Sequence, residues 1–97
     1  MEKKKYGSER WKKKRNRILR RDKYIDKIEA RYGRTVEATI VHHIFPADEY
    51  PELFWTDWNL ISVSRATHQR LHNKDGSLSD FGEELRRRTG EKNGLKR

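Results

Sequence analysis

Apolar residues in the first third of the chain recur at helical spacing. Trp11, Ile18 and Leu19 fall at i, i+7 and i+8 in a stretch that begins at Ser8 and is otherwise rich in Lys and Arg. This pattern predicts an amphipathic helix with Ser8 as its N-cap. A second apolar set predicts a short second helix capped at its C-terminus by Gly33. The members of that set are Tyr24, Ile25, Ile28 and Tyr32.

The middle of the chain changes to a strand pattern. β-Branched residues dominate residues 35–44 and a second apolar run covers 59–63, so two short strands are predicted. Residues 45–58 between them contain both prolines and no Lys or Arg, which indicates a loop. We expect this loop to pack its aromatic residues on the core and to turn its four acidic residues away from phosphate. The large aromatic residues are Phe54, Trp55 and Trp58, and the acidic residues are Asp48, Glu49, Glu52 and Asp57.

The last third of the chain predicts two further helices. The first covers residues 64–73, with Ser64 as its N-cap, and a turn follows at Asp75-Gly76. In the second, Asp80 and Glu83 form an N-cap and N3 pair, and the helix ends near Gly90. The fold class predicted is α+β, a small ββα core with flanking N- and C-terminal helices. Its expected core comprises Tyr24, Ile25, Ile28, Tyr32, Val36, Ile40, Phe54, Trp55, Trp58, Leu60, Ile61 and Leu71.

The charge of the chain is concentrated at one end. Residues 1–23 hold twelve Lys or Arg against three acidic residues, so they carry the whole net charge of +9. This placement favours a polyanionic partner, with nucleic acid first and an anionic membrane surface well behind. We expect a basic arm over 1–7, a single domain over 8–90 and a basic tail over 91–97. The candidate phosphate contacts are Arg10, Lys12, Lys13, Lys14, Arg15, Arg17, Arg20, Arg21, Arg34, Arg65 and Arg70.

The four histidines form two pairs and are the main candidates for chemistry. His68 and His72 lie one helical turn apart, where two imidazoles can hold one metal ion. His42 and His43 are consecutive on a predicted strand, so their side chains point to opposite faces. One of them can complete a three-histidine metal site while the other acts beside it as a general base. The spacing alone leaves open which histidine has which role.

The segments "VHHI", "WNLISV" and "HQRLH" together resemble the motif of HNH, or ββα-metal, endonucleases. Residues 8–74 are similar to small phage-encoded members, and the histidine set is similar to that of colicin-type DNases. The resemblance implies one divalent ion (Mg²⁺, Mn²⁺, Zn²⁺ or Ni²⁺) and hydrolysis of DNA phosphodiester bonds, with a ββα-metal core at about residues 35–74. It implies His43 as general base and Asn59 as the residue that holds the loop and orients this base. The implied metal ligands are His42, His68 and His72.

The chain departs from many phage relatives at one set of positions. Those relatives hold a structural zinc with two C-x2-C pairs, and the matching positions here are Asp26, Glu29, Ser64 and Thr67. The chain has no cysteine and Ser and Thr are poor zinc ligands, so no structural zinc is expected. The resemblance also implies the cytoplasm of a bacterial host and, among partners, phage terminase or packaging proteins. The alternative interpretation is a non-catalytic nucleic-acid-binding module with a structural metal site.

Overall fold

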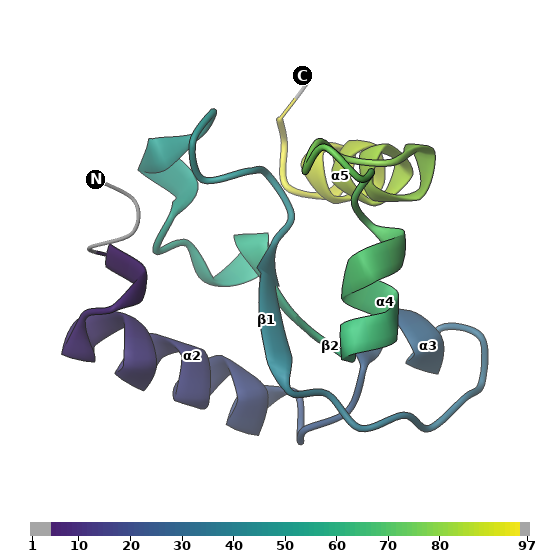
Figure 1. Cartoon of the computed structure of the whole chain (residues 1–97), viewed down its shortest axis with the longest axis horizontal. Coiled ribbons are helices and arrows are strands. Elements are labelled where there is room, and N and C mark those ends of the chain that lie inside the picture. Colours follow the sequence, from purple (N-terminus) through teal and green to yellow (C-terminus); the bar gives the residue numbers. More distant parts are fainter. Residues whose placement is uncertain (1–4, 96–97) are drawn as a thin grey trace.

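The sheet at the centre of the molecule has two antiparallel strands, β1 (Ile40–His43) and β2 (Leu60–Val63) (Figure 1). Its register pairs Ile40 with Val63 at one end and His43 with Leu60 at the other. Both strands were predicted, although β1 is shorter than the β-branched stretch that indicated it. The structure, a computed structural model, describes residues 5–95. The rest of the predicted arm (1–4) and of the predicted tail (96–97) lies outside the described residues.

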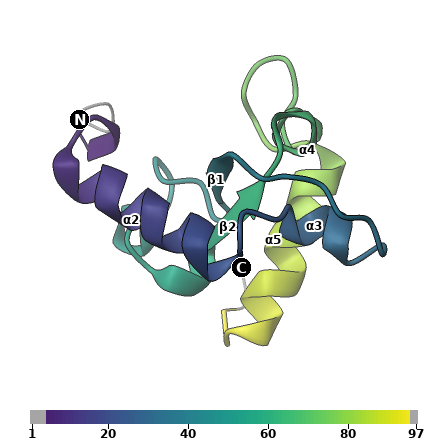
Figure 2. The ribbon, with the colours of Figure 1, turned by 90° about the horizontal axis from the view of Figure 1, so that it is seen from below.

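Helices cover the two sides of this sheet. α2 (Glu9–Arg21) runs along one side, and α3 (Lys27–Ala30), α4 (Arg65–Arg70) and α5 (Asp80–Lys92) lie on the other (Figures 1 and 2). The α+β architecture with flanking helices is therefore confirmed. Within the described part of the chain, no helix has the length and apolar character needed to cross a membrane.

The N-terminal helix forms as its sequence predicts. The hydroxyl of Ser8 accepts a hydrogen bond from the amide of Trp11 at 3.1 Å, which caps the helix. Trp11, Ile18 and Leu19 are buried against the sheet, while most of the Lys and Arg residues stay at the surface. The helix therefore contributes to the core and presents positive charge at the same time.

The second predicted helix is largely absent. Lys23 and Tyr24 have φ angles of 57° and 58°, a left-handed conformation that ends α2 and prevents the helix from continuing. Only one turn, α3, forms afterwards. Tyr24 and Tyr32 are 47% and 59% exposed, so their assignment to the core is wrong. The apolar spacing was correct only for Ile28, which is buried.

The core has two parts, one on each side of the sheet. The first is built around α2 and contains Trp11, Ile18, Leu19, Ala38, Val41, Ala47, Phe54 and Leu60. The second faces α4 and α5 and contains Ile28, Ile44, Phe45, Ile61, Val63, Leu71 and Leu85. Of the predicted core residues, Phe54, Leu60, Ile61 and Leu71 are buried, whereas Ile40, Trp55 and Trp58 pack at its edges.

The connection between the strands is not irregular throughout. It contains two short 3-10 turns, η1 (Pro51–Leu53) and η2 (Asp57–Asn59), and Phe54 between them is fully buried. The aromatic residues of this segment therefore anchor it on the core, as expected. The turns shape the segment so that the backbone around Phe54 passes close to the end of β1.

The two C-terminal helices differ from their predicted limits. α4 stops at Arg70, so His72 lies just beyond it. The N-cap of α5 is Ser79, whose hydroxyl accepts from the amide of Gly82 at 3.2 Å, and not Asp80, and the helix runs on past Gly90 to Lys92. A Cβ atom at Gly82 would lie 2.4 Å from the carbonyl oxygen of Leu71. Gly82 thus allows α5 to cross close to the end of α4, where His72 is held.

Candidate metal centre and active site

Three histidines from separate parts of the fold converge at one point. His42 comes from β1, His68 from α4 and His72 from the residue after the C-cap of that helix. Their candidate donor atoms all lie within 4.8 Å of one another. The ring centroid of His42 lies 5.4 Å from that of His68 and 5.2 Å from that of His72. This is the set of three metal ligands that the HNH resemblance implied.

The charge state of these rings suits a metal ion. Burial, and then the neighbouring histidines, lower the pKa of His42 to about 3. Burial and then His72 also lower the pKa of His68. Both rings are therefore neutral near pH 7, which is the form that binds metal. Nε2 of His42 is buried without a hydrogen-bond partner among residues 5–95, and a cation held by the three rings would satisfy it.

The backbone fixes which nitrogen of His72 faces the cluster. Nδ1 lies 3.1 Å from the carbonyl oxygen of His68. A carbonyl only accepts, so Nδ1 carries the proton and Nε2 remains as the ligand atom. Beyond the helix end, a β-bridge between His72 and Leu78 holds the residue in place. His72 thus reaches the site although α4 ends before it, short of the predicted limit at residue 73.

His43 turns away from the three-histidine cluster into an aromatic enclosure. The indole of Trp11 stacks on its ring, with centroids 5.2 Å apart and planes at 19°. Nε2 of His43 lies 3.0 Å from the carbonyl oxygen of Phe54, and Nδ1 lies 3.3 Å from the hydroxyl of Tyr6. Because the Phe54 carbonyl can only accept, Nε2 carries the proton and Nδ1 is the basic atom of the neutral ring.

Asn59 fastens the loop that carries Phe54. Its side-chain oxygen accepts from the amide of Phe45 at 2.7 Å. Its side-chain nitrogen donates to the carbonyl oxygens of Phe45 at 3.2 Å and of Leu53 at 3.1 Å. Asn59 is fully buried. Asn59 supports the His43 ring indirectly. It holds the carbonyl of Leu53, and the next residue, Phe54, provides the carbonyl that contacts Nε2 of His43.

Both pairs of histidines open onto one pocket of about 770 Å³. Tyr6, His42, His43, His68 and His72 contribute to its wall. Asp48 and Glu49 also line it, so the expectation that the acidic loop turns away from the site is wrong for these two residues. A negatively charged rim attracts cations and limits how closely additional phosphates can approach.

Comparison with known proteins relates the fold to a solved structure. No family model matches the chain, and no curated protein sequence matches it significantly. A solved structure does match: the crystal structure of the HNH endonuclease of the deep-sea thermophilic bacteriophage GVE2 with manganese ion. The TM-score is 0.68 and the identity is 28%, over 70% of this chain and 74% of that chain. The chain is thus related to phage HNH endonucleases.

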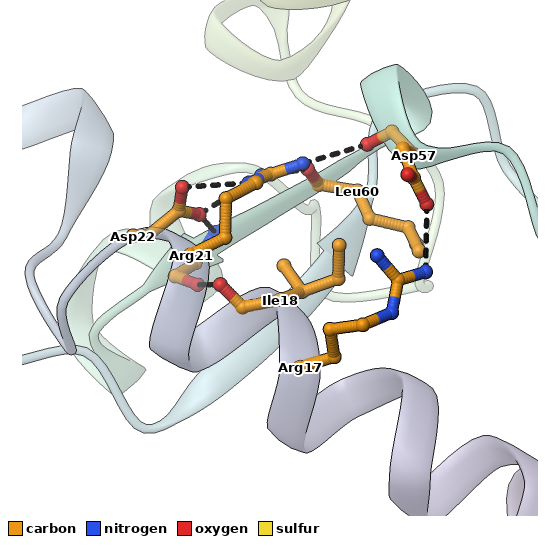
Figure 3. A network of polar contacts seen from close by, with 7 residues as sticks. Arg17, Ile18, Arg21, Asp22, Asp57 and Leu60 are labelled. Atoms are coloured by element: carbon orange, nitrogen blue, oxygen red, sulfur yellow. Dashed lines mark hydrogen bonds and ion pairs between the residues drawn. The ribbon is translucent and has the colours of Figure 1, made fainter.

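The basic side chains of α2 differ in whether they form ion pairs within the protein. Three of its predicted phosphate contacts are engaged within the protein. Arg17 forms an ion pair with Asp57, and Arg21 binds Asp22 and donates to the carbonyl oxygens of Asp57 and Leu60 (Figure 3). Lys14 also pairs with Asp57. These side chains join the helix to the loop and to β2. Lys13, Arg15 and Arg20 form no ion pair with any residue in 5–95.

The remaining predicted phosphate contacts differ in surroundings. Arg10 lies over the ring of Trp55 at 3.9 Å, and Lys12 pairs with Glu9. Arg34 pairs with Glu29 and Arg70 lies over the ring of Phe81 at 4.3 Å. Arg65 is exposed at the first turn of α4. Their roles toward DNA stay predictions.

Side chains at the positions matched to cysteines in HNH relatives are connected by hydrogen bonds. The carboxylate of Asp26 accepts from the amide of Ser64 at 2.8 Å, and the hydroxyls of Ser64 and Thr67 lie 3.2 Å apart. Burial opposes ionisation of Asp26, but the bonds from Thr67, Glu29 and Ser64 outweigh it and lower the pKa. A buried polar network therefore joins the two segments at this place.

Tyr6 is the site residue that sequence reasoning missed. It was assigned to a loose arm, yet its ring contacts those of Trp11, His43 and Phe54 at centroid distances of 5.5, 5.8 and 5.3 Å. The available signal was an isolated aromatic residue in an otherwise basic segment. Such a residue has more to gain from burial than its charged neighbours.

Proposed function

We propose that this protein is a divalent-metal-dependent endonuclease that hydrolyses DNA phosphodiester bonds. The observation that carries the proposal is the convergence of His42, His68 and His72 in a pocket that His43 also lines. A metal ligand set and a nearby base are the two elements required for metal-assisted hydrolysis. The relationship to an HNH endonuclease with manganese ion supports the same chemistry.

Each residue of the site has a defined part in this proposal. His42, His68 and His72 bind the divalent ion, and Mg²⁺, Mn²⁺, Zn²⁺ and Ni²⁺ are the candidates. When bound there, the ion supplies positive charge that offsets the charge developing on the phosphate oxygens. Nδ1 of His43 takes a proton from the attacking water, and the products carry a 5′-phosphate and a 3′-hydroxyl. Asn59 keeps the Phe54 carbonyl in position to hold Nε2.

DNA contacts are proposed along the outer face of α2. Lys13, Arg15 and Arg20 are the best candidates because their charges are not neutralised by ion pairs within residues 5–95. Lys14, Arg17 and Arg21 are assigned mainly to holding the loop. Contacts of this kind position the backbone without reading sequence, so binding should weaken steeply with salt.

The decisive experiment is cleavage of supercoiled plasmid with a panel of divalent ions. The parent protein should nick or cut DNA, and His43→Ala should abolish cutting while it retains folding and DNA binding. Tyr32→Phe, an exposed position outside the pocket, serves as the matched control and should cut like the parent. If the parent protein binds DNA but does not cut it with any of the ions tested, the result would instead favour the non-catalytic binding module.

The proposal extends to the setting of the reaction. Small phage HNH proteins suggest action in the cytoplasm of a bacterial host, beside terminase or other packaging proteins. The relationship to a bacteriophage enzyme supports this setting. Pull-down of a terminase large subunit from phage-infected cells by the tagged protein would test it, with the His43→Ala variant used to avoid DNA damage.

A further inference from the structure

The hydroxyl of Tyr6 contacts the atom of His43 that the proposed mechanism uses as the base. The two atoms, Oη and Nδ1, lie 3.3 Å apart. Because Nε2 of His43 donates to the Phe54 carbonyl at 3.0 Å, Nδ1 holds the lone pair of the neutral ring. The Tyr6 hydroxyl is therefore the donor in this contact. In the free protein it occupies the position from which a water molecule would have to donate.

The orientation of His43 does not depend on this hydroxyl. The indole of Trp11 stacks on one face of the imidazole, and the ring of Phe54 lies 4.6 Å from it between centroids. The carbonyl of Phe54 fixes the edge that carries Nε2. These buried groups already determine the ring plane and its tautomer. The lone pair of Nδ1 accepts one strong in-plane hydrogen bond, so the hydroxyl of Tyr6 competes for it with the attacking water.

The contact has the properties of one that a substrate can displace. Hydrogen bonds from hydroxyl donors are mostly about 2.5–3.0 Å long, so a 3.3 Å bond is weak. Tyr6 is 41% exposed and lines the pocket that holds the histidines. The ammonium group of the preceding residue, Lys5, lies over the ring of Phe54 at 4.9 Å. A phosphate that draws Lys5 from that ring would move Tyr6 with it.

We propose that Tyr6 is a further residue of the reaction centre. Its hydroxyl donates a hydrogen bond to the proton-accepting nitrogen of His43 in the free protein and releases that nitrogen when DNA binds. This inference rests on the proposed function, because it requires His43 to be the base. No covalent change is involved. The hydrogen bond from Tyr6 is replaced by one from the attacking water, and the displacement is driven by contacts between DNA phosphates and the basic segment around Lys5.

Steady-state kinetics of Tyr6→Phe test this role, since the substitution removes the hydroxyl and keeps the ring. Displacing Tyr6 is part of substrate binding, so kcat/KM should rise by about two- to tenfold, the equivalent of one modest hydrogen bond. The value of kcat should stay unchanged. Tyr24→Phe, 47% exposed and outside the pocket lining, should match the parent. A kcat/KM for Tyr6→Phe equal to or below that of the parent would overturn the proposal.

A second measurement does not require activity. The ¹⁵N chemical shift of Nδ1 of His43 should differ between the metal-free parent and Tyr6→Phe, and the difference should vanish when a duplex oligonucleotide is added. Equal shifts in the free proteins would show that the contact is absent and would overturn the proposal. If none of the divalent ions tested supports DNA cleavage by the parent, the proposed function fails, and the proposed role of Tyr6 fails with it. If the parent cleaves DNA but Tyr6→Phe does not raise kcat/KM, only the proposed role of Tyr6 is rejected.

Discussion

The carboxylate of Asp26 accepts a hydrogen bond from the backbone amide of Ser64, 38 residues further along the chain, at 2.8 Å. Its other oxygen accepts from the amides of Ile28 and Glu29, both at 2.9 Å. One buried carboxylate thus caps α3 and ties it to the first residue before α4. Since α4 carries His68, this bond connects α3 to the candidate metal site.

Replacing Asp26 should be strongly destabilising. Asp26→Ala leaves three amides without their acceptor, so we expect a loss of about 2–4 kcal/mol in the free energy of unfolding. Urea denaturation followed by tryptophan fluorescence measures it. Asp80→Ala is the control, because Asp80 is exposed and does not cap α5, and it should cost about 0.5 kcal/mol or less. Equal losses in the two variants would contradict the assigned role of Asp26.

Metal binding should separate the two kinds of histidine. His68→Ala removes one of three converging donors and should weaken Mn²⁺ binding by more than about tenfold in isothermal titration calorimetry. His43→Ala is the matched control, because its ring faces Trp11 and Phe54, and it should bind Mn²⁺ like the parent. Loss of Mn²⁺ affinity in His43→Ala alone would mean that the ligand assignment is wrong.

Asn59 should contribute to stability and to cleavage together. Asn59→Asp keeps the size but cannot donate to the carbonyls of Phe45 and Leu53, and it buries a charge. We expect a loss of about 2–4 kcal/mol in the free energy of unfolding. Cleavage should fall as well, because the backbone next to Phe54 loses its support. Asn16→Asp, at an exposed position of α2, is the control for stability and should leave the free energy of unfolding unchanged.

Asp57 should make stability depend on pH in the acidic range. Hydrogen bonds from Lys14 and then Arg17 lower the pKa of Asp57 from 3.8 to about 2. A depressed carboxyl pKa stabilises the fold above the unfolded value and loses this contribution as pH falls through the folded value. The melting temperature of the parent should therefore exceed that of Asp57→Asn at pH 7, and the gap should narrow between pH 4 and pH 2.

The size of this effect is limited by solvent. The Asp57 side chain is 57% exposed, so the pairs contribute about 1 kcal/mol or less. Asp48→Asn is the control, because Asp48 forms no ion pair with any residue in 5–95. Differential scanning calorimetry of the three proteins at each pH gives the comparison. If the difference in melting temperature between the parent and Asp57→Asn grew toward pH 2, it would contradict a lowered pKa of Asp57.

Local patterns predicted the parts of the fold that local physics determines. The helix after Ser8, both strands and the helical turn at His68 follow from capping residues and apolar spacing, and the structure confirms them. The second helix failed because Lys23 and Tyr24 adopt a left-handed conformation that glycine usually provides. The buried carboxylate of Asp22 accepts a hydrogen bond from the amide of Ser62, 40 residues away. This bond helps to fix the bend, and no local sequence pattern contains it.

The candidate site was predictable to a similar degree. Residue type and spacing indicated a three-histidine set, and the family resemblance indicated which strand histidine belongs to it. The hydrogen bonds of His43 were not predictable, because a backbone carbonyl from Phe54 and a hydroxyl from Tyr6 leave no mark in the spacing of histidines. The same is true of Lys14 and Arg17, whose pairing with Asp57 depends on how the loop returns to α2.

The alternation of side chains along β1 places two different tasks on neighbouring residues, with His42 opposite Ile61 and His43 opposite Leu60. A shift of this pairing by a single residue would exchange the two rings, so that the cation-binding imidazole entered the aromatic enclosure and the base entered the cluster. Single-residue insertions or deletions within β1 should therefore eliminate cleavage even where the protein still folds.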